Sequence, residues 1–519
     1  MARQIREIGS EMSLYRRTNL DTTFDAAAFS GSIDLASEAL GGVTLLCSDD
    51  FFAPMDNLLK PGRGVFIEGK YTERGKWMDG WEPRRRRTPG HDWCIIQLGA
   101  SGQIHGMDID THHFTGNHPP YASVDAVYLP GASAEQLRDE AEWVRVLSQI
   151  PLKRGSQNLF GVTHKGVFTH VRLNIYPAGG VARLRVYGQP TISKNSETRV
   201  DLACLSHGAR ALACSDMFFS PMNNLLLPGT ANDMGEGWET RRSRPPGDDW
   251  LILQLATMGG IEQIDIDTHH FKGNYPDRCA IDAVCWPDAT PHALTRFDDW
   301  VELVPETSLS AHQVHSLNVT QPGPWTHLRL RIYPDGGVSR LRAWGTPVDS
   351  VVPSDGVAQW NQRTMKDAEA EYFRCCGSTR WARTMAKMGP FVSEAHLFGC
   401  AEEQWWHLGD GDWLEAFTHH PRIGSSVAAL KEKFADTASW SSEEQSRVQS
   451  ASDDVIEALA AENNAYFERF GFIFIVCASG LSAEEMLDRL RQRMSNAPEA
   501  ELRIAAGEQM KITRLRLQK

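Results

Sequence analysis

The chain has 519 residues, of which 41% are hydrophobic and 23% are charged. This composition is that of a soluble globular protein and excludes a disordered or fibrous one, and the length predicts about three domains. The 53 Lys and Arg residues are outnumbered by 66 Asp and Glu residues, which gives a formal net charge of −13. A charge of this sign excludes a protein that coats nucleic acid or an anionic membrane.

The first residues carry charges where a secretory signal would need an apolar core. No stretch approaches the roughly 18 consecutive apolar residues of a membrane-spanning helix. The ten cysteines include no CxxC pair, and a chain of this length does not need disulfide bonds for stability. We therefore expect a cytoplasmic protein whose cysteines are reduced and mainly packed in the interior.

An internal repeat organises the first two thirds of the chain. Residues 34–62 return as residues 201–229 at an offset of 167, and after a deletion of ten residues the offset becomes 157. At this second offset GWEPRRRRTPGHDW matches GWETRRSRPPGDDW, DTHHFTGN matches DTHHFKGN, and THVRLNIYPAGG matches THLRLRIYPDGG. We infer two tandem copies of one domain, each long enough to fold around its own core.

Each copy has the sequence pattern of an antiparallel β domain. Apolar Val171, Leu173 and Ile175 alternate with polar residues, between turns that contain Gly and Pro. A period of two indicates strands with one buried face, and several such strands with few helical stretches predict a jelly roll or β-sandwich. The tryptophans of the repeated GWE and DW motifs are interpreted as core residues.

The pattern changes after Gly345. Residues 348–358 contain Pro and Ser without periodicity, which indicates a linker, and helical periodicity follows. Ser482 and Glu485 have capping-box spacing, Gly471 stands where a helix should end, and Pro498 stands at a first helical position. We therefore predict a multidomain chain with an N-terminal extension (1–29), two tandem all-β jelly-roll or β-sandwich repeats (30–192 and 193–347), a linker (348–358) and an all-α helical domain (359–519).

Two polar motifs occur in both copies. GWExRR places a carboxylate beside paired guanidinium groups, and DTHHFxGN supplies adjacent histidines. Arginine binds a small carboxylate bidentately, and an imidazole with a pKa near neutrality can move protons. The motifs therefore indicate hydrolysis of a small anionic substrate. The candidate residues are Glu82, Arg84, Arg85 and His113 in the first copy and Glu239, Arg241, Arg242 and His270 in the second.

Other interpretations of the same motifs remain open at this point. The arginine run is also typical of an exposed, solvated loop. Adjacent histidines in a strand face opposite ways, so at most one of each pair would point into a given site, and the spacing favours no metal. The second copy differs from the first, because GKWMDG becomes NDMGEG, Arg86 becomes Ser243 and the preceding loop is shorter. The two sites are therefore expected to be unequal.

These motifs, together with SDDFFAPMDNLL and RLRVYG, resemble the allantoicase family over about residues 30–347. The resemblance implies two jelly-roll repeats that hydrolyse allantoate to ureidoglycolate and urea. An arginine of GWExRR would hold the substrate carboxylate, and an acidic or imidazole group would protonate the leaving urea nitrogen. A binding module for a sugar or another small ligand is the alternative for the β repeats.

The helical part contains three polar clusters, THHPRIG (418–424), WSSEEQ (440–445) and FGFIFIVCASG (470–480). By themselves, WSSEEQ indicates a helix start and FIFIVCA a buried core segment. With CCGSTRWARTMAKMGPF and ELRIAAGEQMKITRLRL, however, they resemble the decarboxylase of 2-oxo-4-hydroxy-4-carboxy-5-ureidoimidazoline (OHCU), a cofactor-free helical enzyme of urate breakdown. A structural or oligomerising domain is the alternative for this part.

The resemblance implies that His420 is the catalytic acid and that the carboxylate of Glu444 holds the ureido and hydroxyl groups of OHCU. The substrate imine accepts the electrons of the lost CO2, so a positioned proton donor suffices to give (S)-allantoin. We expect a bifunctional hydrolase and lyase with no cofactor or metal, small-molecule substrates and a homo-oligomeric state. The implied pocket residues are Pro421, Ser441, Gln445, Phe474, Ile475, Val476, Cys477 and Ala478.

Overall fold

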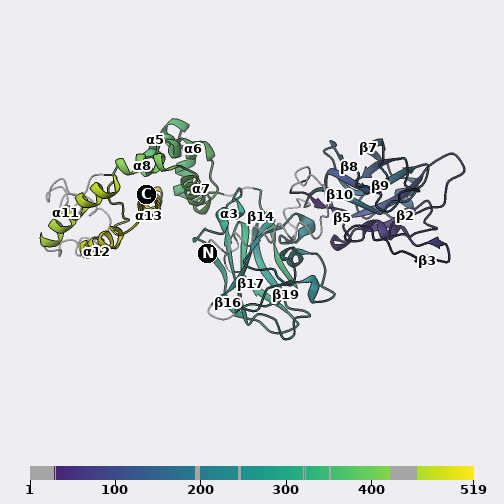
Figure 1. The fold of residues 1–519 in the computed structure, drawn as a ribbon, viewed down its shortest axis with the longest axis horizontal. Helices are drawn as coiled ribbons and strands as arrows, with labels where there is room; N and C mark the ends of the chain where they lie inside the picture. Colours follow the sequence, from purple (N-terminus) through teal and green to yellow (C-terminus); the bar gives the residue numbers. More distant parts are fainter. Residues whose placement is uncertain are drawn as a thin grey trace. The chain divides into compact units, whose positions relative to one another are not determined.

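The computed structural model describes residues 29, 31–192, 199–243, 247–319, 321, 323–349, 352–420 and 453–519. These residues form two compact units. Figure 1 shows the strands of the two repeats and the helices of the part that follows them. The first unit contains both β repeats, up to Val284 and again over Trp300–Asp349. The second contains Cys285–Asp299 and the helical part that follows residue 349. No helix among the described residues is long and apolar enough to cross a membrane.

The first repeat is an antiparallel β-sandwich organised around one long strand, β5 (Asp92–Asp110). Residues 94–97 of β5 lie between β2 and β9, whereas residues 106–108 lie between β8 and β10. β5 therefore contributes to both layers. Its partners and the remaining strands are β1 (Ile33–Asp34), β2 (Val43–Cys47), β6 (Tyr121–Val127), β7 (Val144–Pro151), β8 (Leu159–Gly161), β9 (Val167–Tyr176) and β10 (Arg183–Pro190), with a small hairpin of β3 (Tyr71–Thr72) and β4 (Gly75–Lys76).

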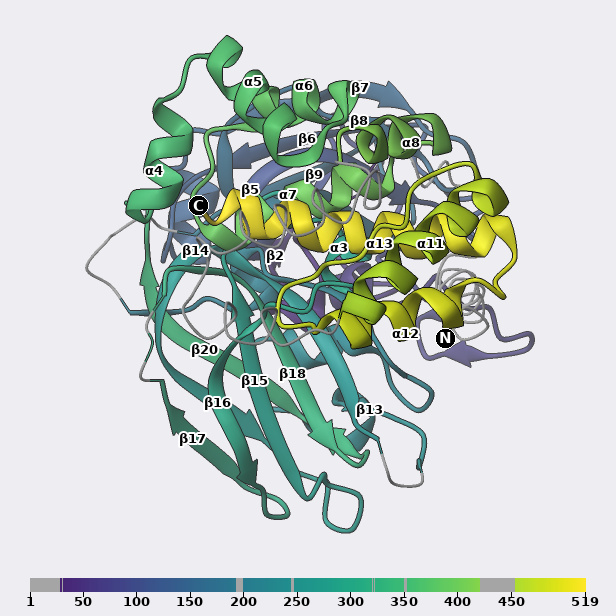
Figure 2. The same ribbon diagram turned by 90° about the vertical axis from the view of Figure 1, so that its left-hand side faces the viewer.

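The second repeat has the same topology around β14 (Asp249–Asp267). Residues 251–254 lie between β12 and β18, and residues 263–267 lie between β17 and β20. Figure 2 shows β15, β16 and β18 side by side, as their pairing requires. The strands are β11 (Val200–Asp201), β12 (Arg210–Cys214), β13 (Trp238–Glu239), β15 (Arg278–Val284), β16 (Val301–Ser308), β17 (Val314–Asn318), β18 (Trp325–Tyr333), β19 (Gly337–Val338) and β20 (Arg340–Pro347).

Short helices complete the β repeats. The first repeat has η1 (Glu38–Leu40), η2 (Met55–Leu59) and α2 (Ala134–Asp139). The second repeat has η3 (Leu205–His207), η4 (Met222–Leu226) and η5 (Met234–Glu236). The repeated sequence pattern is thus matched by a repeated structure, and the predicted all-β fold is confirmed.

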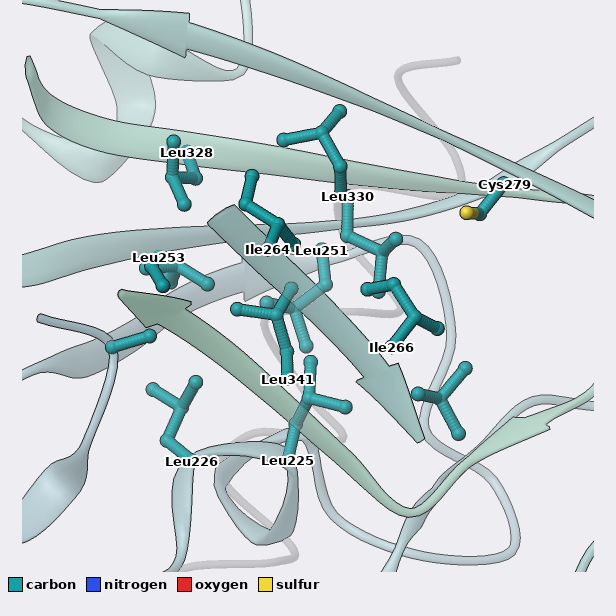
Figure 3. Packing of buried hydrophobic residues seen from close by; sticks show 14 of the residues in the cluster. Leu225, Leu226, Leu251, Leu253, Ile264, Ile266, Cys279, Leu328, Leu330 and Leu341 are labelled. Carbon is teal, nitrogen blue, oxygen red and sulfur yellow. The ribbon is translucent and has the colours of Figure 1, made fainter. Parts of the chain in front are cut away.

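The core of each repeat lies between its two layers. In the second repeat, Leu251 and Leu253 from the first half of β14 meet Ile264 and Ile266 from the second half, and all four are buried (Figure 3). The alternation along the strands places these apolar side chains on one face. Trp81 and Trp238 are fully buried, as predicted, whereas the tryptophans of the DW motifs are half-buried.

The helical unit confirms the predicted all-α domain. Ser482 and Glu485 form the predicted capping box, and Gly471 has the left-handed φ of 78° expected after a helix. One helix begins at Asp355, inside the segment expected to be a linker. The described helices are α4 (Asp355–Gln362), α5 (Met365–Cys376), α6 (Thr379–Met388), α7 (Glu394–Trp406), α8 (Asp410–Thr418), α11 (Asp453–Phe470), α12 (Ala483–Arg493) and α13 (Pro498–Leu517).

Cys285–Asp299, with the short helix α3 (Pro291–Leu294), clusters with the helical unit although the sequence repeat assigns it to the second β copy. The ring of Trp286 lies so close to Gly399 of α7 that a Cβ atom there would overlap it. The hydroxyl of Ser393 donates a hydrogen bond to the carbonyl of Cys285. Sequence repetition and spatial contact therefore place this segment in different parts of the molecule.

Two buried histidines at equivalent positions, His170 in β9 and His327 in β18, make the stability of the repeats depend on pH. Burial lowers the pKa of both, that of His327 to about 4. The unfolded chain binds a proton near pH 6.5, whereas folded His327 does not until about pH 4. The free energy of unfolding should therefore fall on acidification through this window, by up to about 3 kcal/mol for His327.

Urea unfolding followed by tryptophan fluorescence between about pH 7 and about pH 5 tests this expectation. His327→Gln should weaken the pH dependence, and the exposed His164→Gln should leave it unchanged. Equal pH slopes in wild type and His327→Gln would contradict the assignment.

Candidate active sites

Three repeated motifs meet at one end of each sandwich. β5 ends at Asp110, and the DTHHFxGN loop that follows buries Phe114 against Gly80 and Gly180. A Cβ atom at Gly180 would overlap the Phe114 ring. The Gly180 N–H also donates to the carbonyl of Asn117 at 2.8 Å. Trp81 forms an antiparallel β-bridge with Val181, the residue after Gly180. The glycines of GWE and YPxGG are thus required for the close approach of the three segments.

The carboxylates predicted from GWExRR are held by the asparagines of DTHHFxGN. Asn117 donates to Glu82 at 2.6 Å, and Asn274 donates to Glu239 at 2.5 Å. Burial raises the pKa of Glu82, although the hydrogen bond from Asn117 opposes this effect. A carboxyl group with a raised pKa is suited to proton transfer near neutral pH.

The predicted arginines already have acidic partners within the chain. Arg84 contacts Asp49 at 2.6 Å and lies 5.3 Å from the Phe51 ring centroid, and Arg241 makes the same type of ion pair with Asp216 at 2.8 Å. Both arginine side chains are more than half exposed. Exposed ion pairs contribute little stability, so a substrate carboxylate could compete for these arginines. Arg85 and Arg242 are exposed.

The adjacent histidines lie in turns and not in strands, which corrects the premise that the two side chains of a pair must face opposite ways. The ring centroids of His112 and His113 are only 3.9 Å apart. His113 and His270 have left-handed φ values of 66° and 71°, which are uncommon for residues other than glycine. Both rings of a pair are therefore candidates for one site.

Two residues at these sites were not predicted. Arg63 binds Asp110 through two hydrogen bonds of 3.1 and 3.2 Å, and it lies in the loop that is ten residues longer in the first copy. His312 accepts a hydrogen bond from the backbone N–H of His270 at 2.8 Å. It replaces Gly155 of the first copy and keeps a left-handed φ of 56°. Alignment of the two repeats shows this replacement, so the sequence alone could have identified His312 as a candidate.

The helical unit positions the predicted pocket segment 474–478 through buried polar contacts. Arg493 donates to the carbonyl of Ile475 at 2.9 Å, and the Cys477 N–H donates to Glu508 at 2.7 Å. Arg493 is itself paired with Glu501, which is fully buried. Sequence reasoning missed these three charged residues, which fix the backbone of the segment.

The predicted His420 follows the end of α8 and is half-buried, and its backbone N–H donates to the carbonyl of Phe417 at 3.2 Å. Four further predicted residues of this site, Pro421, Ser441, Glu444 and Gln445, lie outside the described residues. Their contacts with His420 therefore stay a prediction.

One cluster in the described part of the chain has the donor types of a zinc site. The donor atoms of Asp288, His396 and Cys400 lie within 4.8 Å of one another. The Val392 N–H donates to His396 Nδ1 at 3.2 Å, which places the imidazole proton on Nε2, 2.8 Å from Asp288. Because Nδ1 accepts this hydrogen bond, a metal bound at Nε2 would leave the imidazole without a ring proton, so the geometry favours an Asp–His pair beside a buried thiol.

Packing of the DTHHFxGN loop can be tested with two glycine variants. Gly180→Ala should destabilise the first repeat by about 1–3 kcal/mol because the new methyl group would displace Phe114. Gly116→Ala is the matched control, since a Cβ atom there meets no other atom within 4 Å. Thermal unfolding of the full chain measures both variants, and equal effects would refute this packing argument.

Comparisons with known proteins agree with this division of the chain. The family model described as Allantoicase repeat matches residues 33–191 and 200–348, and the model described as OHCU decarboxylase matches residues 361–518. A "Probable allantoicase 1" of Burkholderia mallei is 46% identical over 320 residues, which are 60% of this chain and 94% of the relative.

Two solved structures are similar to different parts of the chain. An allantoicase structure is 34% identical, with a TM-score of 0.51, over 65% of this chain and 98% of its own. A structure of OHCU decarboxylase in the presence of (S)-allantoin is 39% identical over 28% of this chain and 94% of its own, with a TM-score of 0.24. Because the family models match both β repeats and the helical part, the chain belongs to the allantoicase family and carries an OHCU decarboxylase domain after the repeats.

Proposed function

We propose that the chain is a bifunctional enzyme of urate and allantoin degradation. The β repeats hydrolyse allantoate to ureidoglycolate and urea, and the helical domain decarboxylates OHCU to (S)-allantoin. The observation that carries this proposal is the match of both family models, which together span most of the chain. The same matches do not favour the alternative of a sugar-binding module with a structural helical domain.

The geometry of the β repeats supports a hydrolase. In each repeat a hydrogen bond joins the glutamate of GWExRR to the asparagine of DTHHFxGN, so the motif with the exposed arginines contacts the motif with the paired histidines. Arginines recognise the allantoate carboxylate, and a proton donor assists the departure of the urea nitrogen. The arginines Arg84 and Arg241 bind the substrate by exchanging their internal carboxylate partners for it.

For the helical domain we infer a decarboxylation that depends on proton transfer and needs no cofactor. His420 delivers the proton to the carbon that loses CO2, and Glu444 holds the ureido and hydroxyl groups. The segment 474–478 lines the pocket, and Arg493 and Glu508 support its backbone. The two reactions are not consecutive, because allantoin must be hydrolysed to allantoate between them. The homo-oligomeric state, the cytoplasmic location and the absence of a cofactor stay predictions.

Two assays on the full chain test both activities. Wild type should release urea from allantoate and form allantoin from freshly prepared OHCU. His420→Asn should lower allantoin formation by roughly 10²- to 10⁴-fold, the usual contribution of general acid catalysis, and leave urea release unchanged. Saturable allantoate binding without urea would refute the hydrolase, and unchanged OHCU turnover in His420→Asn would refute the role of His420.

Glu508 offers a test of the pocket segment. Glu508→Ala removes the acceptor of the Cys477 N–H and should lower OHCU turnover, with about 1–3 kcal/mol lost from the stability of the helical domain. Glu508→Gln keeps an oxygen acceptor at the same position and should retain most of both. Urea release from allantoate serves as the control. Equal turnover in the two variants would show that this hydrogen bond does not support the pocket.

A further inference from the structure

The second repeat contains an Asp–His pair that the first repeat lacks. His269 Nδ1 lies 2.6 Å from Asp267 Oδ1, and the same carboxylate oxygen accepts the backbone N–H of His269 at 2.8 Å. Asp267 is nearly buried, whereas the His269 side chain is 40% exposed. A buried carboxylate thus holds a partly exposed imidazole.

This hydrogen bond fixes the tautomer of His269. An Asp carboxylate can only accept, so Nδ1 carries the proton and Nε2 presents a lone pair. A carboxylate that binds Nδ1–H also stabilises the imidazolium that forms when Nε2 takes up a proton. His269 therefore has the orientation and the partner of a group that accepts and returns protons.

In the first repeat, the equivalent aspartate forms an ion pair with an arginine side chain. Asp110 binds the guanidinium of Arg63, so it is not the partner of the His112 ring. Burial lowers the pKa of His112, and the positive charges of Arg63 and His113 add to this effect. Arg63 belongs to the longer loop of the first copy, and the shorter loop of the second copy leaves Asp267 to His269.

His312 reinforces the arrangement in the second repeat. Its Nδ1 accepts the N–H of His270, and its ring centroid lies 4.8 Å from that of His269 in an edge-on orientation. His270 Nε2 in turn donates to the carbonyl of Ala231 at 2.9 Å. The neighbours of His269 are thus hydrogen-bonded in place, which limits the positions that its ring can take.

We propose that His269, oriented by Asp267, is the proton-transfer group of allantoate hydrolysis and that the second repeat carries this step. The proposal rests on the hydrolase function proposed above. The C–N bond to one ureido group breaks, its electron pair goes to the departing nitrogen, and a water oxygen forms the new C–O bond. One water proton passes through His269 Nε2 to that nitrogen, so the products are ureidoglycolate and urea. Asp267 acts as a positioning residue.

Matched variants of the two repeats in the full chain provide the test. His269→Asn should lower kcat/KM for urea release by roughly 10²- to 10⁴-fold, whereas His112→Asn should lower it less than about tenfold. Asp267→Asn should lower kcat with little change in KM, and Asp110→Asn is its counterpart in the first repeat. Turnover of OHCU by the helical domain monitors the concentration of intact protein, and the thermal unfolding of each variant monitors the fold of the repeats.

The outcomes separate this inference from the proposed function. A wild-type chain that releases no urea would overturn both. Urea release by wild type and equally by His269→Asn would overturn the inference alone, as would a loss in His112→Asn as large as that in His269→Asn. If Asp267→Asn changed only KM, Asp267 would bind substrate and not orient the imidazole.

Discussion

The architecture of each repeat depends on one strand that changes partners along its length. β5 and β14 pair with different neighbours in their two halves, so a single segment joins both layers of the sandwich. The last residue of each strand is the aspartate of DTHHFxGN. Because the strand is fixed on both sides by hydrogen bonds and buried side chains, this aspartate begins the loop from a rigid position. The candidate site residues of each repeat therefore follow directly from a strand that is hydrogen-bonded on both sides.

The two repeats differ in the side chain that pairs with this aspartate. A longer loop brings a guanidinium to Asp110, and a shorter loop with a histidine in place of Gly155 leaves Asp267 to an imidazole. Neither change alters the sandwich, because both lie in loops outside the core. Duplication thus allows one copy to change its electrostatics while both keep the packing that holds the loop.

Sequence alone predicted those features that depend on local patterns. The alternation of apolar and polar residues predicted the buried faces of the strands, and the internal repeat predicted the two copies. Cap residues such as Ser482 predicted helix ends. The partners of charged side chains were harder to predict, because they depend on contacts between distant segments. Arg84 meets Asp49 and Arg493 meets Glu501 only in the folded chain. Arg63 had no counterpart in the second copy, so comparison of the repeats gave it no weight.

The segment Cys285–Asp299 has a consequence for how the two enzymes can be separated. In the first repeat the corresponding residues Tyr128 and Leu129 are exposed, whereas Cys285 and Trp286 are buried within the helical unit. A cut after the second repeat would expose Trp286 and remove it from α7. Each product would then carry an exposed apolar surface that favours association. Separate expression of the two parts would therefore call for polar substitutions at Cys285 and Trp286.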